Sequence, residues 1–338
     1  MKCNICPRAC NVDRNVDKGF CGMTNDIYAA RAALHMWEEP CISGEHGSGA
    51  VFFSGCTLRC IFCQNSEIAA AHVGKKITVE RLSDIFLELQ DKCANNINLV
   101  TATHFVPQVA EALVKAKNKG LVIPVVYNSS AYENVSTLNM LDGLVDVYLP
   151  DMKYIDSRLS AEYSKAPDYA DVAKAAIHEM VRQTRKPEFF IEDDELVKSG
   201  RVEAGIMKKG VIVRHLVLPG TTKDSKAVIK YLIDTYGDDI YISIMSQYTP
   251  MPGIGERYPE LAHKVDFDQY NELVDYAIEA AIGAGADDIC LVVGYKYEVV
   301  RETILHQEVN FVLQEEQLGT GHAVRCAKDF LGDEGQTM

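Results

Sequence analysis

The sequence lacks the features that take a protein to a membrane or onto nucleic acid. No apolar run approaches the ~20 residues that span a bilayer. The first residues, Met-Lys-Cys-Asn-Ile-Cys, contain no apolar stretch of the secretory type, so we expect a cytoplasmic protein. Lys and Arg number 34 against 48 Asp and Glu, and the formal net charge is −14. Because phosphate backbones are bound by clustered cations, we expect neither nucleic acid nor membrane as a partner.

Cysteine, in contrast, is plentiful. The 338 residues are 47% hydrophobic and 24% charged, as in ordinary globular proteins, and they include 11 cysteines. Most of these cysteines lie close together in the sequence. Without a secretory signal, closely spaced cysteines indicate metal ligation in a reducing compartment rather than disulfides.

The central motif is a loop of three cysteines. Ala50–Phe53 predicts a buried strand that Gly55 ends, and Cys56, Cys60 and Cys63 follow with the spacing C-x3-C-x2-C. Soft thiolates favour an iron–sulfur cluster or zinc. A four-iron cluster usually takes four cysteines, so three would leave one iron open to a substrate or cofactor. A zinc site completed by a distant Cys or His is the alternative.

A second group of cysteines lies at the N-terminus. Cys3, Cys6, Cys10 and Cys21 are enough for a closed four-thiolate site. Zinc and iron–sulfur clusters both accept four thiolates, and the spacing does not separate them. The group is either a structural clip or an electron-transfer site.

The rest of the chain alternates strands and helices, which predicts a parallel sheet covered by helices. We expect six strand–helix units, fewer than the eight of a closed barrel. The predicted strands are 50–53, 98–101, 122–127, 145–149, 211–218 and 240–246, and the predicted helices are 78–92, 106–119, 135–141 and 161–184, the last interrupted at Pro167. Residues 186–209 are acidic and predict a solvated hairpin.

Polar residues recur at the C-terminal ends of the predicted strands, where parallel α/β proteins place their functional groups. Each alone would be a helix cap or a loop residue, but their recurrence predicts one shared cavity. They are Thr101, Thr103, His104, Asn128, Ser129, Ser130, Asp151, Lys153, His215, Gln247 and Tyr248.

The cysteine loop resembles that of the radical S-adenosylmethionine (SAM) superfamily, in which an aromatic residue, here Phe62, precedes the last cysteine. Further segments resemble one subgroup, the uncharacterised iron–sulfur proteins related to pyruvate formate-lyase activating enzyme. These segments are Cys3–Cys10, Trp37–Gly44, Asn96–Val100, Tyr148–Lys153 and Arg214–Gly220. The resemblance runs from Cys3 to about Ala280 and implies an α/β fold, a partial (β/α)6 TIM-like barrel.

The resemblance implies a radical SAM oxidoreductase in which Cys56, Cys60 and Cys63 hold a [4Fe-4S] cluster. An electron donor such as flavodoxin or ferredoxin would drive cleavage of SAM to methionine and a 5′-deoxyadenosyl radical that abstracts hydrogen. The hydrogen would come from a glycine of a glycyl-radical enzyme, the expected partner.

The resemblance also implies which residues contact SAM. Asp151 and Lys153 match the activating-enzyme pattern, whereas Thr101–His104 replaces the Gly-Gly-Glu turn that usually meets the SAM amino group. The full expected set is Phe62, Thr101, Thr103, His104, Asn128, Asp151, Lys153 and His215.

The C-terminal part resembles a different family. From about Leu273 the pattern predicts helix, strand, helix, strand and helix, and it resembles an internal piece of N-acetylglucosamine-1-phosphate uridylyltransferase. In that resemblance Gln314, Gly319 and Thr320 match positions that meet uracil. The chain contains no glycine-rich phosphate-binding signature of that family, so we expect no pyrophosphorylase activity. The predicted segments are therefore 1–45, Cys-rich; 46–280, the barrel; and 281–338, a nucleotidyltransferase-like fragment.

Two other functions remain open. The cysteines alone would also suit an electron-transfer or metal-binding protein with two metal centres and no SAM chemistry. Such a protein would not need polar groups at successive strand ends. Nucleotidyl transfer is suggested by the C-terminal segment alone.

Overall fold

Six parallel strands follow one another across a curved sheet, which confirms the partial (β/α)6 barrel. The computed structural model describes residues 2–286, 290–293 and 309–313. In spatial order the six are β2 (Ser48–Phe53), β4 (Ile97–Val100), β5 (Val125–Ser129), β6 (Val147–Pro150), β8 (Met207–Leu216) and β9 (Tyr241–Met245). In the described chain β9 pairs with β8 and not with β2, so the sheet does not close.

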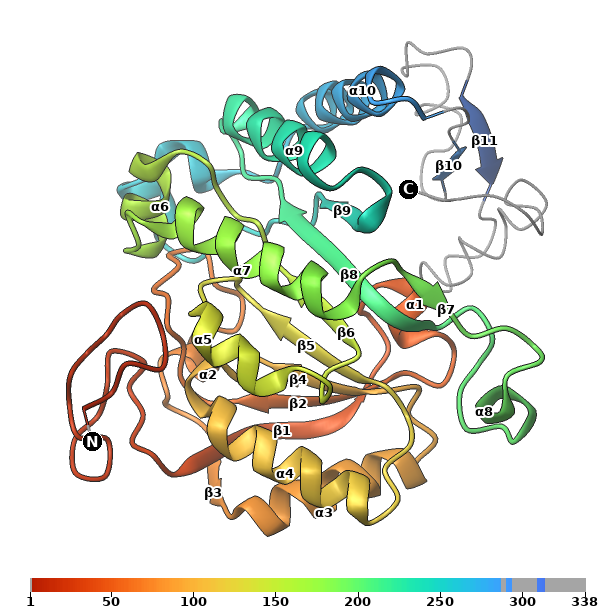
Figure 1. Cartoon of the computed structure of the whole chain (residues 1–338). Helices are drawn as coiled ribbons and strands as arrows, with labels where there is room; N and C mark the ends of the chain where they lie inside the picture. Colours follow the sequence, from red (N-terminus) through yellow and green to blue (C-terminus); the bar gives the residue numbers. More distant parts are fainter. Residues whose placement is uncertain (1, 287–289, 294–308, 314–338) are drawn as a thin grey trace.

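Helices cover the convex face of the sheet (Figure 1). The longer ones are α3 (Val79–Asp91), α4 (Val106–Asn118), α6 (Ser157–Ser164), α7 (Tyr169–Thr184), α9 (Thr222–Tyr236) and α10 (Phe267–Gly283). The apolar stripe of α3 shows why they pack there. Leu82, Ile85, Phe86 and Leu89 share one side of this helix and are all buried. Thr78 caps the helix by accepting a hydrogen bond from the Arg81 N–H.

Short helices complete the fold. The α-helical turns are α1 (Pro40–Ser43), α2 (Ser66–Ala69), α5 (Val135–Leu138) and α8 (Glu195–Lys198). The 3-10 turns are η1 (Thr103–Phe105), η2 (Asn139–Leu141), η3 (Gly237–Asp239), η4 (Ile254–Glu256) and η5 (Pro259–Ala262). In the part of the chain that the structure describes, no helix is both long and apolar enough to cross a bilayer.

Strand alternation separates two chemical environments along β8. Val211 and Val213 belong to the main apolar core beneath the helices, and His215 reaches Ser225 of α9. Ile212 and Arg214 point the other way, into the concave interior of the barrel. Ile212 packs there against Ile42 of α1, which fills the end of the barrel where the strands begin.

The sheet extends beyond the six predicted strands. β1 (Ile27–His35) lies within the predicted segment 1–45 and pairs antiparallel with β2, and β3 (Lys75–Ile77) pairs with β1. At the opposite edge β7 (Glu188–Phe189) pairs antiparallel with β8. β1 and β3 do not appear in the sequence prediction, whereas β7 lies in the predicted hairpin 186–209.

The predicted helix 161–184 is two helices. α6 ends at Ser164, and Lys165 adopts the left-handed conformation with φ 57° before α7 begins at Tyr169. Pro167 lies in this break, because proline disfavours a helical conformation at the residue before it.

The insertion 186–209 forms the predicted hairpin with β8, but it is not wholly solvated. Phe190, Val202 and Ile206 are buried in the main core. The carboxylate of Glu203 accepts hydrogen bonds from the backbone N–H groups of Glu45 and His46, at 3.0 and 2.6 Å. The hairpin therefore anchors the loop between α1 and β2 through these hydrogen bonds.

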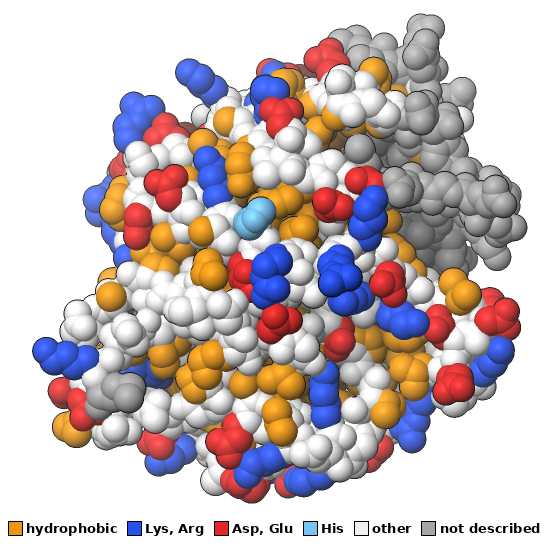
Figure 2. Space-filling model, viewed as in Figure 1, with side chains coloured by type: hydrophobic (Ala, Val, Ile, Leu, Met, Phe, Trp, Pro, Cys, Tyr) orange, Lys and Arg blue, Asp and Glu red, His pale blue; other side chains and the backbone are white. Residues whose placement is uncertain are grey.

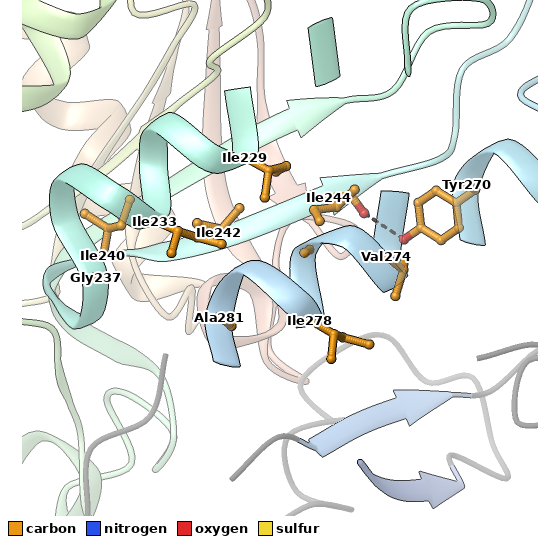
Figure 3. A pocket seen from close by; sticks show the side chains of 11 residues that line it. Ile229, Ile233, Gly237, Ile240, Ile242, Ile244, Tyr270, Val274, Ile278 and Ala281 are labelled. Carbon is orange, nitrogen blue, oxygen red and sulfur yellow. Dashed lines mark hydrogen bonds between the residues drawn. The ribbon is translucent and has the colours of Figure 1, made fainter. Parts of the chain in front are cut away.

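Beyond the barrel, α10 packs on α9, and β10 (Cys290–Val293) pairs in parallel with β11 (Asn310–Leu313). β10 is a strand in the region after Leu273, where the sequence predicts strands alternating with helices. Gln314, Gly319 and Thr320 lie outside the described residues. Between β9, α9 and α10 lies an apolar cavity of about 340 Å³, lined by Ile229, Ile242, Tyr270 and Ile278 among others (Figure 3). On the face shown in Figure 2, charges of both signs are interspersed.

Candidate active site

The loop of Cys56, Cys60 and Cys63 begins where β2 ends, as predicted. Gly55 makes the turn with φ +86°. A Cβ at this position would lie 2.6 Å from the Cys21 carbonyl oxygen and 2.5 Å from Met23 Cγ, so only glycine fits. The loop is thus held close against the N-terminal segment.

The three thiols are partly shielded from solvent and influence one another. Burial, and after it the neighbouring Cys60, raise the pKa of Cys56 to about 12. Burial also raises the pKa values of Cys60 and Cys63. The Cys60 Sγ lies 3.0 Å from the Ser164 Oγ. Without a bound metal these thiols would stay protonated at neutral pH, because thiolates need a compensating positive centre.

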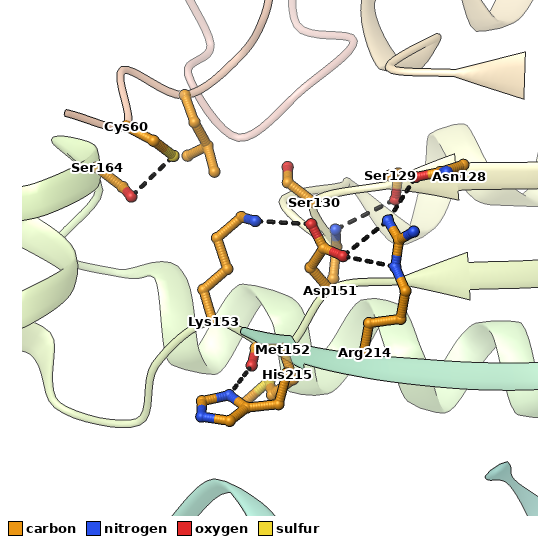
Figure 4. Close-up of polar contacts among 12 residues, drawn as sticks. Cys60, Asn128, Ser129, Ser130, Asp151, Met152, Lys153, Ser164, Arg214 and His215 are labelled. Atoms are coloured by element: carbon orange, nitrogen blue, oxygen red, sulfur yellow. Dashed lines mark hydrogen bonds and ion pairs between the residues drawn. The ribbon is translucent and has the colours of Figure 1, made fainter. Parts of the chain in front are cut away.

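Lys153 and Asp151 meet the cysteine loop from the end of β6. Lys153 Nζ donates to Asp151 Oδ2 at 2.6 Å, and Figure 4 shows the lysine extended toward the loop that carries Cys60. Burial alone would lower the pKa of Lys153, but the nearby Asp151 and Cys60 outweigh it and the net pKa is raised. Lys153 is therefore a fixed cation beside the thiols.

Arg214 supports Asp151 from the neighbouring strand. Its Nε donates to Asp151 Oδ1 at 2.9 Å, and its Nη2 donates to Asn128 Oδ1 at 2.8 Å. Burial opposes ionisation of Asp151, but Arg214 and Lys153 together lower the net pKa of this carboxyl group. Asp151 thus stays ionised between two cations.

Two further carboxylates reach the same guanidinium from the segment before α1. Glu38 Oε2 lies 3.0 Å from Arg214 Nη1, and Glu39 Oε2 lies 3.8 Å from it. Asn128 Nδ2 donates to Glu38 Oε1 at 3.1 Å. Burial, and after it the charge of Glu38, raise the pKa of Glu39 despite Arg214. The barrel interior next to the cysteine loop is therefore a charged network, whereas the end where the strands begin is apolar.

Thr101 directly follows β4 and has an unusual backbone conformation. Its φ is +62°, a genuine outlier for a β-branched residue. Its N–H donates to the Asn128 carbonyl oxygen at 2.9 Å, which joins the ends of β4 and β5. Thr103 faces elsewhere and donates to Glu133 Oε1 at 2.6 Å in a buried setting. Strained residues of this kind cluster at functional sites.

Besides Thr103, three more of the residues expected to contact SAM lie apart from this network. The His215 ring bonds the Met152 carbonyl and Ser225 on the helix-covered face, because it is one residue out of phase with Arg214. His104 Nε2 lies 2.7 Å from the Ser54 carbonyl, and Phe62 is buried in the main core.

The residues present fit an iron–sulfur cluster, because the loop after β2 supplies three closely spaced thiols. Among residues 2–286, 290–293 and 309–313, no three His, Cys, Asp or Glu side chains converge as ligands of one ion. A four-iron cluster takes its thiolates on different irons, so its ligands need not converge on one point.

The polar groups also fit SAM, whose amino and carboxylate groups require an anion and a cation side by side. Asp151 and Lys153 provide them at one strand end. Deeper in the interior, Asn98 is fully buried and neither of its side-chain amide atoms has a partner in the described chain. A buried amide without hydrogen-bond partners indicates that a ligand or a water molecule binds beside it.

Sequence reasoning missed Arg214, Glu38 and Glu39 as site residues. The signal was present, because Arg214 lies within the strand predicted at 211–218, directly after the apolar run Val211–Val213. A charge inside a buried strand must be paired. Glu38 and Glu39 carry no periodic pattern, so only the fold brings them to Arg214.

Known proteins resemble two parts of the chain. An uncharacterised protein of Methanocaldococcus jannaschii is 27% identical over 282 residues, which are 81% of this chain and 74% of that protein. The bifunctional protein GlmU of Clostridium perfringens is 43% identical over 84 residues, 25% of this chain and 17% of GlmU. The chain therefore spans only a small part of GlmU.

Among solved structures, native anSMEcpe with bound AdoMet covers 71% of this chain and 59% of its own, at TM-score 0.42 and 12% identity. Methylornithine synthase (PylB) covers 78% and 70%, at TM-score 0.43 and 11% identity. The model of the radical SAM superfamily matches residues 50–232, which are more than half of the chain and run from within β2 to within α9. This chain belongs to the radical SAM superfamily.

Proposed function

We propose that this protein is an enzyme in which Cys56, Cys60 and Cys63 bind a [4Fe-4S] cluster and Asp151 and Lys153 bind the methionine end of SAM. When bound, the cluster and SAM supply a reductive cleavage to methionine and a 5′-deoxyadenosyl radical that abstracts hydrogen. Membership of the superfamily supports SAM-dependent radical chemistry. The roles given to these individual residues are what we propose.

The chain's own residues would orient SAM rather than exchange protons with it. Lys153 stays cationic and suits the carboxylate of SAM, while the ionised Asp151 suits its amino group. Arg214 fixes Asp151 from behind. Because these groups are largely buried, their charges act at short range with little screening by water.

One observation carries the proposal. The cysteine loop follows β2, whereas Asp151 and Lys153 follow β6, about 90 residues later in the chain. Because the ends of parallel strands meet at one edge of the sheet, the two groups come together there. The fold brings Lys153 close enough to interact electrostatically with all three thiols. This coupling is what a cluster with an adjacent SAM site requires.

The test is SAM cleavage by the anaerobically reconstituted protein. We expect dithionite-reduced protein to release 5′-deoxyadenosine and methionine, and Lys153→Met to raise the Kd for SAM tenfold or more without loss of iron. The matched control is Lys119→Met, which removes an exposed lysine of a surface ion pair. Absence of 5′-deoxyadenosine from the iron-loaded protein would refute the enzyme reading.

The hydrogen donor is a finer part of the proposal. The resemblance to activating enzymes supports a glycine of a partner glycyl-radical enzyme, with flavodoxin or ferredoxin as electron donor. Anaerobic capture from lysate, followed by a search for a glycyl radical by electron paramagnetic resonance, tests it. A small-molecule product from the lysate in place of a protein radical would rule this partner out.

The second candidate is a protein with two metal centres that transfers electrons without SAM chemistry. It is favoured by one observation, the packing of the N-terminal cysteines against the Cys56 loop. We propose that Cys3, Cys6, Cys10 and Cys21 bind zinc or a second cluster in either case. Reversible reduction of two centres without 5′-deoxyadenosine formation would favour this candidate.

A further inference from the structure

The N-terminal cysteines lie directly against the loop of the catalytic cysteines. The Cys21 carbonyl oxygen and Met23 occupy the space that a side chain at Gly55 would need, at 2.6 and 2.5 Å from its Cβ. Gly55 immediately precedes Cys56 in the chain. The backbones of the two cysteine groups are therefore in van der Waals contact, with no intervening layer of structure.

Phe20 joins the two groups through a pair of arginines. The Arg8 guanidinium carbon lies 4.1 Å from the centre of the Phe20 ring, and that of Arg59 lies 4.7 Å from it. Arg8 Nε donates to the Thr57 carbonyl at 2.7 Å, and Arg59 Nη1 donates to the Cys56 carbonyl at 3.2 Å. Both arginines thus bind the carbonyl groups of the catalytic loop while they hold Phe20.

The four N-terminal thiols form one group. A Cβ at Gly19 would lie 3.4 Å from the Cys21 Sγ and 3.7 Å from the Cys10 Sγ, so both sulfur atoms flank this glycine. The Phe20 N–H donates to the Cys10 Sγ at 3.1 Å. Cys6 and Cys21 are buried, and all four thiols are free. Backbone N–H donors to sulfur are typical of iron–sulfur sites.

The segment around these thiols has almost no regular secondary structure. Residues 2–25 contain no helix, and their only strand pairing is the isolated bridge between Lys2 and Asp13. Outside the group, Glu133 is buried with its Oε2 unpartnered in the described chain, and it is close enough to Cys6 to interact with it electrostatically. A short segment of this kind usually needs a metal or disulfide staple.

We propose that Cys3, Cys6, Cys10 and Cys21 bind an iron–sulfur cluster that relays the electron to the cluster on Cys56, Cys60 and Cys63. A low-potential one-electron protein donor of the flavodoxin or ferredoxin class is oxidised as the N-terminal cluster is reduced. That cluster is reoxidised as it reduces the catalytic one, and no bond or proton changes place. The relay role rests on the proposed SAM chemistry, whereas the cluster site does not.

Iron is preferred to zinc because the proposed role is electron transfer, and zinc has no redox chemistry with which to pass an electron on. Cys3 and Cys10 are partly exposed, whereas Cys21 faces the catalytic loop. The group therefore spans from the surface, where a donor docks, to the catalytic cysteines.

The first measurement is the metal content of anaerobically reconstituted protein. We expect about eight iron atoms per chain and about four in Cys10→Ser or Cys3→Ser. The matched control is Cys93→Ser, which removes an exposed thiol far along the chain, after α3. This variant should keep about eight iron atoms per chain. One zinc with about four irons, or no metal beyond four irons, would overturn the proposal.

The second measurement separates the relay from the chemistry. The rate of 5′-deoxyadenosine formation is measured with reduced flavodoxin and with dithionite, and the ratio of the two rates should fall tenfold or more in both variants but not in Cys93→Ser. An unchanged ratio overturns the relay. If the eight-iron protein cleaves no SAM with either reductant, the proposed function fails while the cluster site stands.

A third measurement covers the case in which neither variant folds. Unmodified protein is mixed with substoichiometric reduced flavodoxin and freeze-quenched for electron paramagnetic resonance. SAM alters the signal of the catalytic cluster, which identifies each centre. Reduction of the SAM-insensitive centre first supports the relay, and reduction of the catalytic centre first overturns it.

Discussion

Arg214 holds Asp151 through a hydrogen bond of 2.9 Å between Nε and Oδ1, and it is the central cation of the barrel interior. Glu38 and Glu39 approach the same guanidinium. Three carboxylates therefore depend on one arginine and on Lys153. The arrangement orders the ends of two strands and fixes the orientation of the group proposed to meet SAM.

Replacing Arg214 should destabilise the fold, because three buried carboxylates would lose their shared cation. We expect Arg214→Leu to lower the free energy of unfolding by about 3–5 kcal/mol. Urea denaturation measures the change. The control is Arg158→Ala, because the Arg158 side chain is 90% exposed. This substitution should lower the free energy of unfolding by at most about 1 kcal/mol. An Arg214→Leu protein as stable as the control would contradict the network.

Each catalytic cysteine should be indispensable. Cys56→Ala, Cys60→Ala and Cys63→Ala should each abolish SAM cleavage and bleach most of one cluster's absorbance, because two thiolates do not hold a four-iron cluster with one iron open. Product analysis and the visible spectrum measure these losses. Retained 5′-deoxyadenosine formation in any of the three would rule the ligand assignment out.

Gly55 should tolerate no side chain. In Gly55→Ala the methyl group would lie 2.6 Å from the Cys21 carbonyl, at φ +86°. We expect loss of iron from both cysteine groups and easier proteolysis of the N-terminal segment. Gly143→Ala is the control, since its φ is +77° but nothing lies within 4 Å. It should cost only about 1–2 kcal/mol. Equal behaviour of the two variants would mean that the contact is unimportant.

Stability should fall with acid partly through His215. Burial lowers the pKa of His215 to about 4 from an ordinary value of 6.5. The unfolded chain therefore takes up a proton between pH 6.5 and 4 while the native state does not, so this contribution is present above pH 6.5 and declines as pH falls toward 4. The loss amounts to about 3 kcal/mol. His215→Gln should show a flatter dependence in this window, and an unchanged slope in urea titrations would refute the assignment.

The GlmU-like segment should be inactive in nucleotidyl transfer. The match covers 17% of GlmU, and the chain contains no glycine-rich phosphate-binding signature. We expect no pyrophosphate release from a uridine nucleotide and an N-acetylglucosamine phosphate. Isothermal titration provides the counter-test, because micromolar binding of a uridine nucleotide that is lost in Gln314→Ala would show a working nucleotide site.

The strand–helix alternation was predictable because each unit has its own apolar period. β1 was not, since Ile27–His35 contains four alanines and one arginine, a composition that favours helix. It becomes a strand because β2 offers an unpaired edge, which is a tertiary effect. Local pattern therefore predicted the six units and not their flanking strands.

The site was predictable to the level of strand ends. Asp151 and Lys153 lie where the end-of-strand rule places them, and they meet at the cysteine loop. His215 shows the limit of that rule, because one residue along a strand reverses the direction of a side chain. Register was not evident from the sequence, and it decides that Arg214 rather than its neighbour faces the interior.

The contact between Glu203 and the backbone of Glu45 and His46 also orders events in time. A ribosome releases residues 45 and 46 long before residue 203, and domains complete their packing only when the contacting segments are out. The loop beneath the barrel must therefore wait, with its N–H groups bonded to water, until some 150 further residues have emerged. During synthesis the catalytic cysteines are therefore on the chain well before this contact of Glu203 can form.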